Sequence, residues 1–137
     1  YRLRQDPGPH NALGKVKFMF PNRFNVYLHD TSSPELFEKT SRTFSSGCIR
    51  IQNPLELAHY LLKDDPRWNS QAIQDQLAKN TEKTVTLRAP VDIHLLYWTA
   101  FVDHAGILHF RKDIYGRDGR LTKALYAKPP TLNRGQP

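Results

Sequence analysis

The chain has 137 residues, of which 39% are hydrophobic and 24% are charged, so it is long enough for one globular domain with a core. A single cysteine excludes a disulfide-stabilised scaffold, and no apolar run reaches the roughly 20 residues that cross a bilayer. The formal net charge of +7 favours an acidic partner, which includes nucleic acid, a membrane surface or a carboxylate-rich substrate.

Much of this positive charge lies at the C-terminal end. Residues 116–137 have little apolar periodicity, so we expect them to form a basic, flexible tail; their cations are Arg117, Arg120, Lys123, Lys128 and Arg134. Aromatic and basic side chains do not interleave elsewhere in the way that stacks bases. We therefore expect no nucleic-acid partner.

The N-terminal third is predicted to contain two strands. Residues 7–14 are dense in proline, glycine and asparagine, which is typical of a loop, and they lead into a strand at KVKFMF, residues 15–20. Residues 24–30 alternate apolar and polar side chains with the period of a half-buried strand. His29 is thereby placed at a strand end. A short proline-initiated turn of helix is expected at PELFEK, residues 34–39.

Two helices are expected next. Asn53 is a typical N-cap, Pro54 suits the first helical position, and Glu56 is placed to complete a capping box; Leu55, Ala58, Leu61 and Leu62 then form an apolar face. A second helix is predicted from about Asn69 to Lys79, with Asn80 as its stop.

The remaining elements are predicted to be strands. Residues 85–88 and 91–102 are rich in β-branched and aromatic side chains, and the second run is apolar on both faces, like a central strand. Residues 103–106 form a hairpin turn that returns through ILHFRKDIY. The sequence therefore predicts one mostly β domain without repeats, with two helices at its surface.

The stretch FSSGCIRI, residues 44–51, contains the single cysteine, Cys48. A structural zinc site is disfavoured without a second cysteine, which leaves a buried hydrophobe, a surface thiol or a catalyst. Ser-Ser-Gly suits a tight turn that exposes the next side chain. Arg50 either favours a thiolate and holds an anionic group or is a solvated surface charge.

A catalytic cysteine needs a base, and histidine is its usual partner. His29 differs from the other histidines because it ends a strand and is followed by Asp30, Thr31 and a loop long enough to bring Cys48 back to it. The others are expected to be partly exposed polar residues; these are His10, His59, His94, His104 and His109.

These ordered motifs resemble the YkuD-type L,D-transpeptidases, whose signature is a histidine, a spacer and Ser/Thr-x-Gly-Cys-x-Arg/Asn. His29-Asp30 and residues 45–50, SSGCIR, match that signature. Residues 11–14, NALG, are similar to the family's Asn-Pro-Leu-Gly segment, with alanine in place of proline. Together with VDIHLLYWTAFVD, they look closest to the YcbB branch, which consists of periplasmic enzymes of Gram-negative bacteria. The resemblance covers residues 1–115 as the C-terminal part of a catalytic domain.

The resemblance implies a YkuD fold, a β-sandwich or barrel-like structure with a few surface helices. The family's domain starts with strands ahead of the Asn-Leu-Gly segment. We therefore expect the chain to lack the first strands of the domain.

The family resemblance also implies a reaction mechanism. Cys48 attacks the meso-diaminopimelate carbonyl of a donor tetrapeptide stem and releases D-alanine, and His29 accepts the thiol proton. The side-chain amine of an acceptor stem then attacks the thioester and forms a 3-3 crosslink. Backbone N–H groups at Ser46, Gly47 and Cys48 are candidates for an oxyanion hole.

Other site residues follow from the same resemblance. Arg50 is expected to orient the turn or bind a stem carboxylate. Asn11, Tyr27 and Ser45 are expected to contact substrate, although plain packing explains Tyr27 equally well.

The implied partners are donor and acceptor peptidoglycan stems, with carbapenems as covalent inhibitors and no metal or organic cofactor. We also expect a monomer in the periplasm, with roles in peptidoglycan biosynthesis, cell shape and β-lactam resistance. The acceptor stays open among a stem peptide, water, a D-amino acid and a lipoprotein lysine.

Two alternatives remain. A sortase-like enzyme also uses histidine, cysteine and arginine on a β scaffold, but it does not account for the NALG segment or the SSGC turn. A non-catalytic basic module that binds peptidoglycan predicts that Cys48→Ala leaves function intact.

Overall fold

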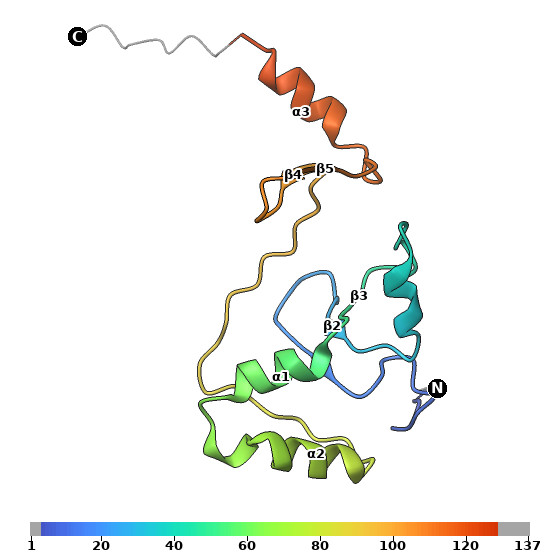
Figure 1. Cartoon of the computed structure of the whole chain (residues 1–137), viewed down its shortest axis with the longest axis vertical. Helices are drawn as coiled ribbons and strands as arrows, with labels where there is room; N and C mark the ends of the chain where they lie inside the picture. The colour runs from blue at the N-terminus through green and yellow to red at the C-terminus, as the bar shows by residue number, and fades with distance from the viewer. Residues whose placement is uncertain (1–3, 129–137) are drawn as a thin grey trace, which may run out of the picture. The chain divides into compact units, whose positions relative to one another are not determined.

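The computed structural model describes residues 4–128 (Figure 1), and the chain divides after Pro90 into two compact units. The first unit contains strands β1 (Lys17–Phe18), β2 (Leu28–His29) and β3 (Ile49–Arg50), the 3-10 helices η1 (Pro34–Glu38) and η2 (Pro66–Trp68), and helices α1 (Pro54–Leu62) and α2 (Ser70–Ala78). The second contains β4 (Ala100–Val102), β5 (Leu108–Phe110) and α3 (Asp118–Leu125).

The first unit is organised around a three-stranded sheet with the order β1-β2-β3. β1 runs antiparallel to β2, whereas β3 runs parallel to it. A parallel pair requires a crossover between its strands, and residues 30–48, which include η1, supply it. This crossover brings the segment around Cys48 back beside His29.

The strands are shorter than the alternation of the sequence predicts. Between β1 and β2, the side-chain oxygen of Asn22 accepts hydrogen bonds from the N–H groups of Phe24 and Val26, each at 3.1 Å. Asn25 has a left-handed backbone with φ of 53°. This loop interrupts the extended chain, so strand β2 begins only at Leu28.

Both predicted surface helices are present. α1 begins at Pro54 as expected, but the side chain of Asn53 makes no backbone cap and instead donates to the Glu56 carboxylate at 3.2 Å. In α2, the side chain of Asn69 accepts a hydrogen bond from the Ala72 N–H at 2.9 Å. The turn after α2 contains Asn80, which adopts a left-handed φ of 49°. The PELFEK segment forms the 3-10 helix η1 rather than an α-helical turn.

A small core and one carboxylate hold the helices of this unit together. Pro54 and Ala58 of α1 and Ile73 of α2 are the buried apolar side chains among the described residues. Asp65 is also buried, caps η2 through the Arg67 N–H, and lies 2.6 Å from the Arg67 guanidinium and 3.7 Å from that of Arg88. The hydrogen bond from Arg67 lowers the pKa of Asp65 to about 2.

The second unit is built on the predicted hairpin. The Asp103 carboxylate accepts hydrogen bonds from Ala105 and Ile107, and Gly106 takes the left-handed φ of 80° that the turn requires. His109 contacts the same carboxylate at 2.7 Å. The expected strand at residues 91–102 is wrong over most of its length, because only Ala100–Val102 pair with β5 and residues 91–98 are exposed.

The prediction of a mostly β sandwich or barrel is corrected by these elements. Residues 4–128 form three α-helices and two small sheets and close no barrel, although the arrangement is compatible with the YkuD fold. The alternation of apolar and polar side chains in the sequence predicted strands longer than the hydrogen-bonded strands that the structure contains. No helix among these residues is long and apolar enough to span a membrane.

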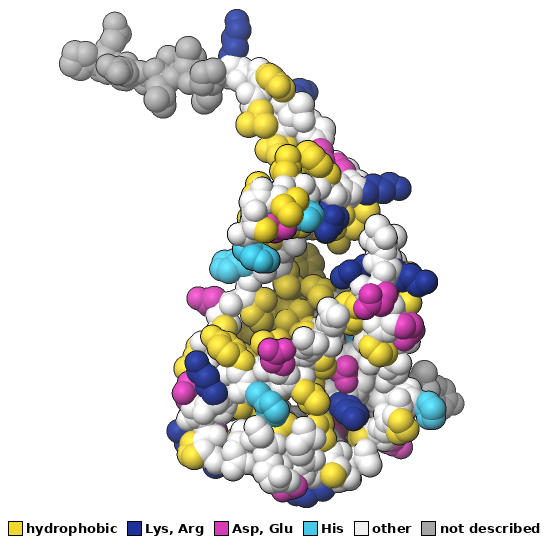
Figure 2. All heavy atoms as spheres, viewed as in Figure 1, with side chains coloured by type: hydrophobic (Ala, Val, Ile, Leu, Met, Phe, Trp, Pro, Cys, Tyr) yellow, Lys and Arg dark blue, Asp and Glu magenta, His cyan; other side chains and the backbone are white. Residues whose placement is uncertain are grey.

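The segment expected to be a tail contains α3 within its described part. Leu121 and Leu125 lie one turn apart on this helix, and both are exposed, as are many apolar side chains of the hairpin (yellow in Figure 2). Residues 129–137, which include Arg134, lie outside the described residues.

Candidate active site

The parallel register of β2 and β3 brings the candidate nucleophile and base to one face. Leu28 pairs with Ile49 and His29 with Arg50, so Tyr27 lies beside Cys48 one position earlier in each strand. The Ile49 N–H donates to the Tyr27 carbonyl at 3.0 Å, which extends the ladder to this position. Since side chains alternate between faces, Tyr27, His29, Cys48 and Arg50 share one face.

The backbone at the end of β2 orients the His29 imidazole as a candidate base. Its side chain is buried, and Nδ1 contacts the backbone carbonyl of Asp30. A carbonyl oxygen only accepts hydrogen bonds, so Nδ1 carries the proton and Nε2 keeps its lone pair. This tautomer can accept a proton from a neighbouring thiol.

Tyr27 contacts both members of this pair. Its ring meets the His29 imidazole edge-on, with 5.8 Å between ring centroids. A hydrogen bond to Cys48 raises the pKa of Tyr27 above its ordinary value, and burial and the charge on Cys48 raise it further. The phenol therefore stays protonated and can donate to a thiolate.

The turn before Cys48 is tied by Ser45. The Ser45 hydroxyl donates to the Cys48 carbonyl, and it accepts weakly from the Gly47 N–H at 3.4 Å. A Cβ atom at Gly47 would lie 3.4 Å from Val26 Cγ1, in van der Waals contact, so the turn lies beside the segment that leads into β2. Cys48 is half-buried, and Ser46 is exposed.

Two of the three candidate oxyanion donors keep their N–H groups available. Ile49 and Ile51 donate to the carbonyls of Tyr27 and His29, so the N–H groups that alternate with them, which include that of Cys48, point away from β2. Within residues 4–128, the N–H groups of Ser46 and Cys48 have no hydrogen-bond acceptor, whereas that of Gly47 contacts Ser45.

The NALG segment packs against the strand end that carries His29. Gly14 has φ of 62°, and a Cβ atom there would clash with the Asp30 carboxylate. That carboxylate accepts hydrogen bonds from the Lys15 and Thr31 N–H groups, both at 2.7 Å. Asp30 thus positions His29, a role that the sequence interpretation missed although the residue directly follows the histidine.

Asn11 closes the same turn. Its carbonyl accepts from the Gly14 N–H at 2.9 Å, its side-chain oxygen accepts from Leu13, and its amide donates to the carbonyls of Gln5 and Asp6. These contacts give Asn11 a role in shaping the loop. Its expected contact with substrate stays a prediction.

Two cations border the face. Lys17 of β1 is opposite His29, and its Nζ lies 4.0 Å from the centroid of the Tyr27 ring. Nε and Nη1 of Arg50 are buried without a hydrogen-bond partner in the described chain. The face therefore combines a thiol, an imidazole and a phenol with two positive charges.

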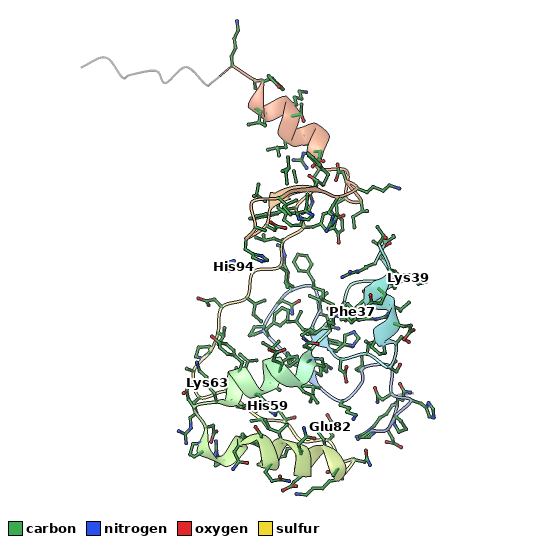
Figure 3. The ribbon with its side chains drawn as sticks, viewed as in Figure 1. Phe37, Lys39, His59, Lys63, Glu82 and His94 are labelled. Carbon is green, nitrogen blue, oxygen red and sulfur yellow. The ribbon has the colours of Figure 1, made fainter. Side chains whose placement is uncertain are left out.

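The other histidines lie outside this group. His59 lies on α1 and His94 in the second unit (Figure 3), whereas His10 and His104 are exposed and His109 pairs with Asp103. Among the described residues, no cluster of three His, Cys, Asp or Glu side chains is arranged to hold a metal ion.

Comparison with known proteins agrees with the motifs. Residues 1–93 match the family model of YkuD, described as the L,D-transpeptidase catalytic domain. The chain is also 36% identical over 124 residues to a curated Haemophilus influenzae protein named "Putative L,D-transpeptidase". That alignment covers 90% of this chain but only 25% of the relative, so the chain spans a quarter of the length of the protein that it matches.

Proposed function

Because the chain belongs to the YkuD family of L,D-transpeptidase catalytic domains, we propose that it transfers peptidoglycan stem peptides through a thioester on Cys48. The observation that carries this proposal is the register that sets Tyr27 beside Cys48 and both on the face of His29. Acyl transfer through cysteine requires a thiol and a base, which the buried imidazole with its fixed tautomer supplies, and the protonated phenol adds a donor for the thiolate.

In the first half-reaction, His29 Nε2 accepts the thiol proton, and the Cys48 thiolate attacks the meso-diaminopimelate carbonyl of a tetrapeptide stem. The Cys48 N–H and its neighbours stabilise the oxyanion of the tetrahedral intermediate. The bond to D-alanine breaks, and the imidazolium returns its proton to the leaving amine. The product is a thioester between the stem and Cys48.

In the second half-reaction, the side-chain amine of an acceptor diaminopimelate attacks the thioester. His29 accepts a proton from that amine, the Cys48 thiolate leaves, and the imidazolium returns the proton to the sulfur. The result is a 3-3 crosslink between two stems. The positive charge of the chain favours approach to an acidic polymer.

The same proposal includes the branch of the family, the cellular compartment and the inhibitors of the protein. We place the protein in the YcbB branch, as a monomer in the periplasm, where peptidoglycan is the substrate. A carbapenem, whose strained ring is an acyl donor, acylates Cys48 and blocks the reaction. This gives the protein its proposed roles in cell shape and β-lactam resistance.

The test is incubation of the full-length protein with purified disaccharide-tetrapeptide, followed by mass spectrometry of the products. We expect free D-alanine and a dimer joined through two diaminopimelates, and neither with Cys48→Ala. A protein that consumes no tetrapeptide, or whose Cys48→Ala variant is equally active, contradicts the proposal. Ser41→Ala, an exposed change in the crossover loop, is the control.

A further inference from the structure

A row of three side chains crosses the sheet, with His29 between two cations. The ladder places Lys17 of β1 opposite His29 and Arg50 of β3 opposite it on the other side. The proton transfers proposed above use His29 but not Lys17. Yet Lys17 lies over the ring of Tyr27, which the register of β2 and β3 places beside Cys48.

No carboxylate of the described chain neutralises these cations. The ion pairs of residues 4–128 involve other arginines and His109, and the nearby Asp30 carboxylate is used by backbone N–H groups. Two guanidinium nitrogens of Arg50 are buried without a partner. Buried donors without acceptors cost free energy, so this arrangement favours an anionic ligand that supplies them.

We propose that Lys17 and Arg50 form a carboxylate subsite across His29, in which Lys17 is a specificity-determining residue for the donor stem. This inference rests on the proposed function, because it names the part of the donor that the same face recognises. Lys17 is exposed, and its contact with the Tyr27 ring is weak enough to be exchanged for an ion pair with a substrate. A carboxylate bound there lies beside the thiol.

The donor offers two carboxylates of this kind near the scissile bond. One is the terminal carboxylate of D-alanine, which leaves, and the other is the free carboxylate of the diaminopimelate side chain, which stays on the enzyme. The experiment therefore uses three synthetic tetrapeptide donors, namely the unmodified stem, a stem amidated at D-alanine and a stem amidated at the diaminopimelate side chain. Steady-state D-alanine or D-alaninamide release is measured with the full-length protein.

The variants are Lys17→Met, Lys17→Arg and the matched control Lys63→Met. Lys63 also lies over a tyrosine ring, with its Nζ 4.7 Å from the Tyr60 centroid, but it is placed at the end of α1 remote from β3 (Figure 3). Removing it deletes the same charge and the same kind of contact away from the site.

We expect Lys17→Met to raise KM for the unmodified stem about fivefold, the effect of one partly exposed ion pair, while kcat changes by less than about twofold. Lys17→Arg should restore KM, and Lys63→Met should leave it unchanged. The wild-type protein should lose affinity for one amidated stem, and with that stem the Lys17→Met effect should disappear. The carboxylate that is amidated in that stem is then the one that Lys17 binds.

Three results overturn the subsite: no change in KM with Lys17→Met, an equal change with Lys63→Met, or an equal Lys17→Met effect on all three donors. The last result would mean that Lys17 only supports the Tyr27 ring. Formation of the thioester by the wild-type protein is the separate readout of the proposed function. A protein that forms it but treats the three donors alike contradicts the subsite alone, and a protein that forms it with none contradicts the proposed function.

Discussion

Tyr27, His29 and Cys48 depend on a single register between two short strands. The sequence identified His29 and Cys48 as candidates because of their residue types and their motifs. It left Tyr27 open between substrate contact and plain packing. The register of a parallel pair is set by a crossover of many residues, and no local pattern encodes it.

The hydrogen bond between Tyr27 and Cys48 gives the first prediction. Tyr27→Phe removes a donor to the thiolate, and we expect alkylation of Cys48 by iodoacetamide at pH 7 to slow about tenfold, since a hydrogen bond to a charged group contributes about 1.5 kcal/mol. The measurement is the mass-resolved rate of modification. The exposed Tyr60→Phe on α1 is the control, and equal rates for both variants would argue against the contact.

Asp30 illustrates what the motif did not reveal. The sequence shows a carboxylate after the histidine, but its contacts come from a turn 15 residues earlier in the chain. Only the folded turn places the Lys15 N–H and Gly14 against it. A local pattern therefore predicted the histidine and missed the residue that positions it.

At the scale of elements, the helices were predictable because their signals are local. A proline at the first position marks the start of α1, an asparagine cap marks the start of α2, and apolar spacing supports both within their own segments. A strand needs a partner strand elsewhere in the chain, so alternation of side chains alone predicted strands that are too long. The apolar run at residues 91–98 has β propensity but no ladder within the described residues.

The NALG turn gives the second prediction. Gly14→Ala places a side chain at φ of 62° and against the Asp30 carboxylate, and the left-handed backbone alone costs about 1–2 kcal/mol. We expect the melting temperature to fall by several degrees and thioester formation to slow, because the strand end at His29 shifts. Differential scanning fluorimetry and intact mass measure the two effects.

Gly119→Ala is its matched control. Gly119 lies in α3, has no left-handed φ and no atom within 4 Å of an added Cβ. Alanine is the better helix former there, so stability should be unchanged or slightly higher. A Gly14→Ala variant as stable as Gly119→Ala would contradict the close packing of the turn on Asp30.

The third prediction concerns Asp65 at the start of η2. Its pKa of about 2 in the folded chain is below the ordinary 3.8, so ionised Asp65 stabilises the fold above about pH 4, and this contribution is lost as the pH falls towards 2. Asp65→Asn should melt below the wild type at pH 7, and the difference should shrink below pH 4. A difference that is constant from pH 7 to pH 2 would show that the Arg67 pair does not set it.

For the whole molecule, the second unit has exposed apolar side chains and no buried residue among its described members. An isolated two-stranded hairpin is marginally stable, and the exposed Leu121 and Leu125 of α3 bury little apolar surface to support it. We expect a fragment of residues 91–137 to show no cooperative thermal transition by circular dichroism. A sharp transition at protein concentrations where the fragment is monomeric would contradict this expectation.

The overall architecture was the least predictable level. Composition predicted one globular domain with a core and the strand pattern predicted a mostly β fold, whereas the described residues bury few side chains and form three α-helices beside two small sheets. Fold class depends on which strands find partners. The family was nevertheless evident from the sequence, because its motifs lie in short segments around the site.

The proposed function depends on Cys48 as an acylated nucleophile that His29 activates. The most direct measurement is the intact mass of the full-length protein after incubation with a carbapenem, beside Cys48→Ala and His29→Ala. We expect one covalent adduct on the parent, none on Cys48→Ala and a much slower one on His29→Ala. A folded parent that gains no mass, or an adduct that persists on Cys48→Ala, would contradict it.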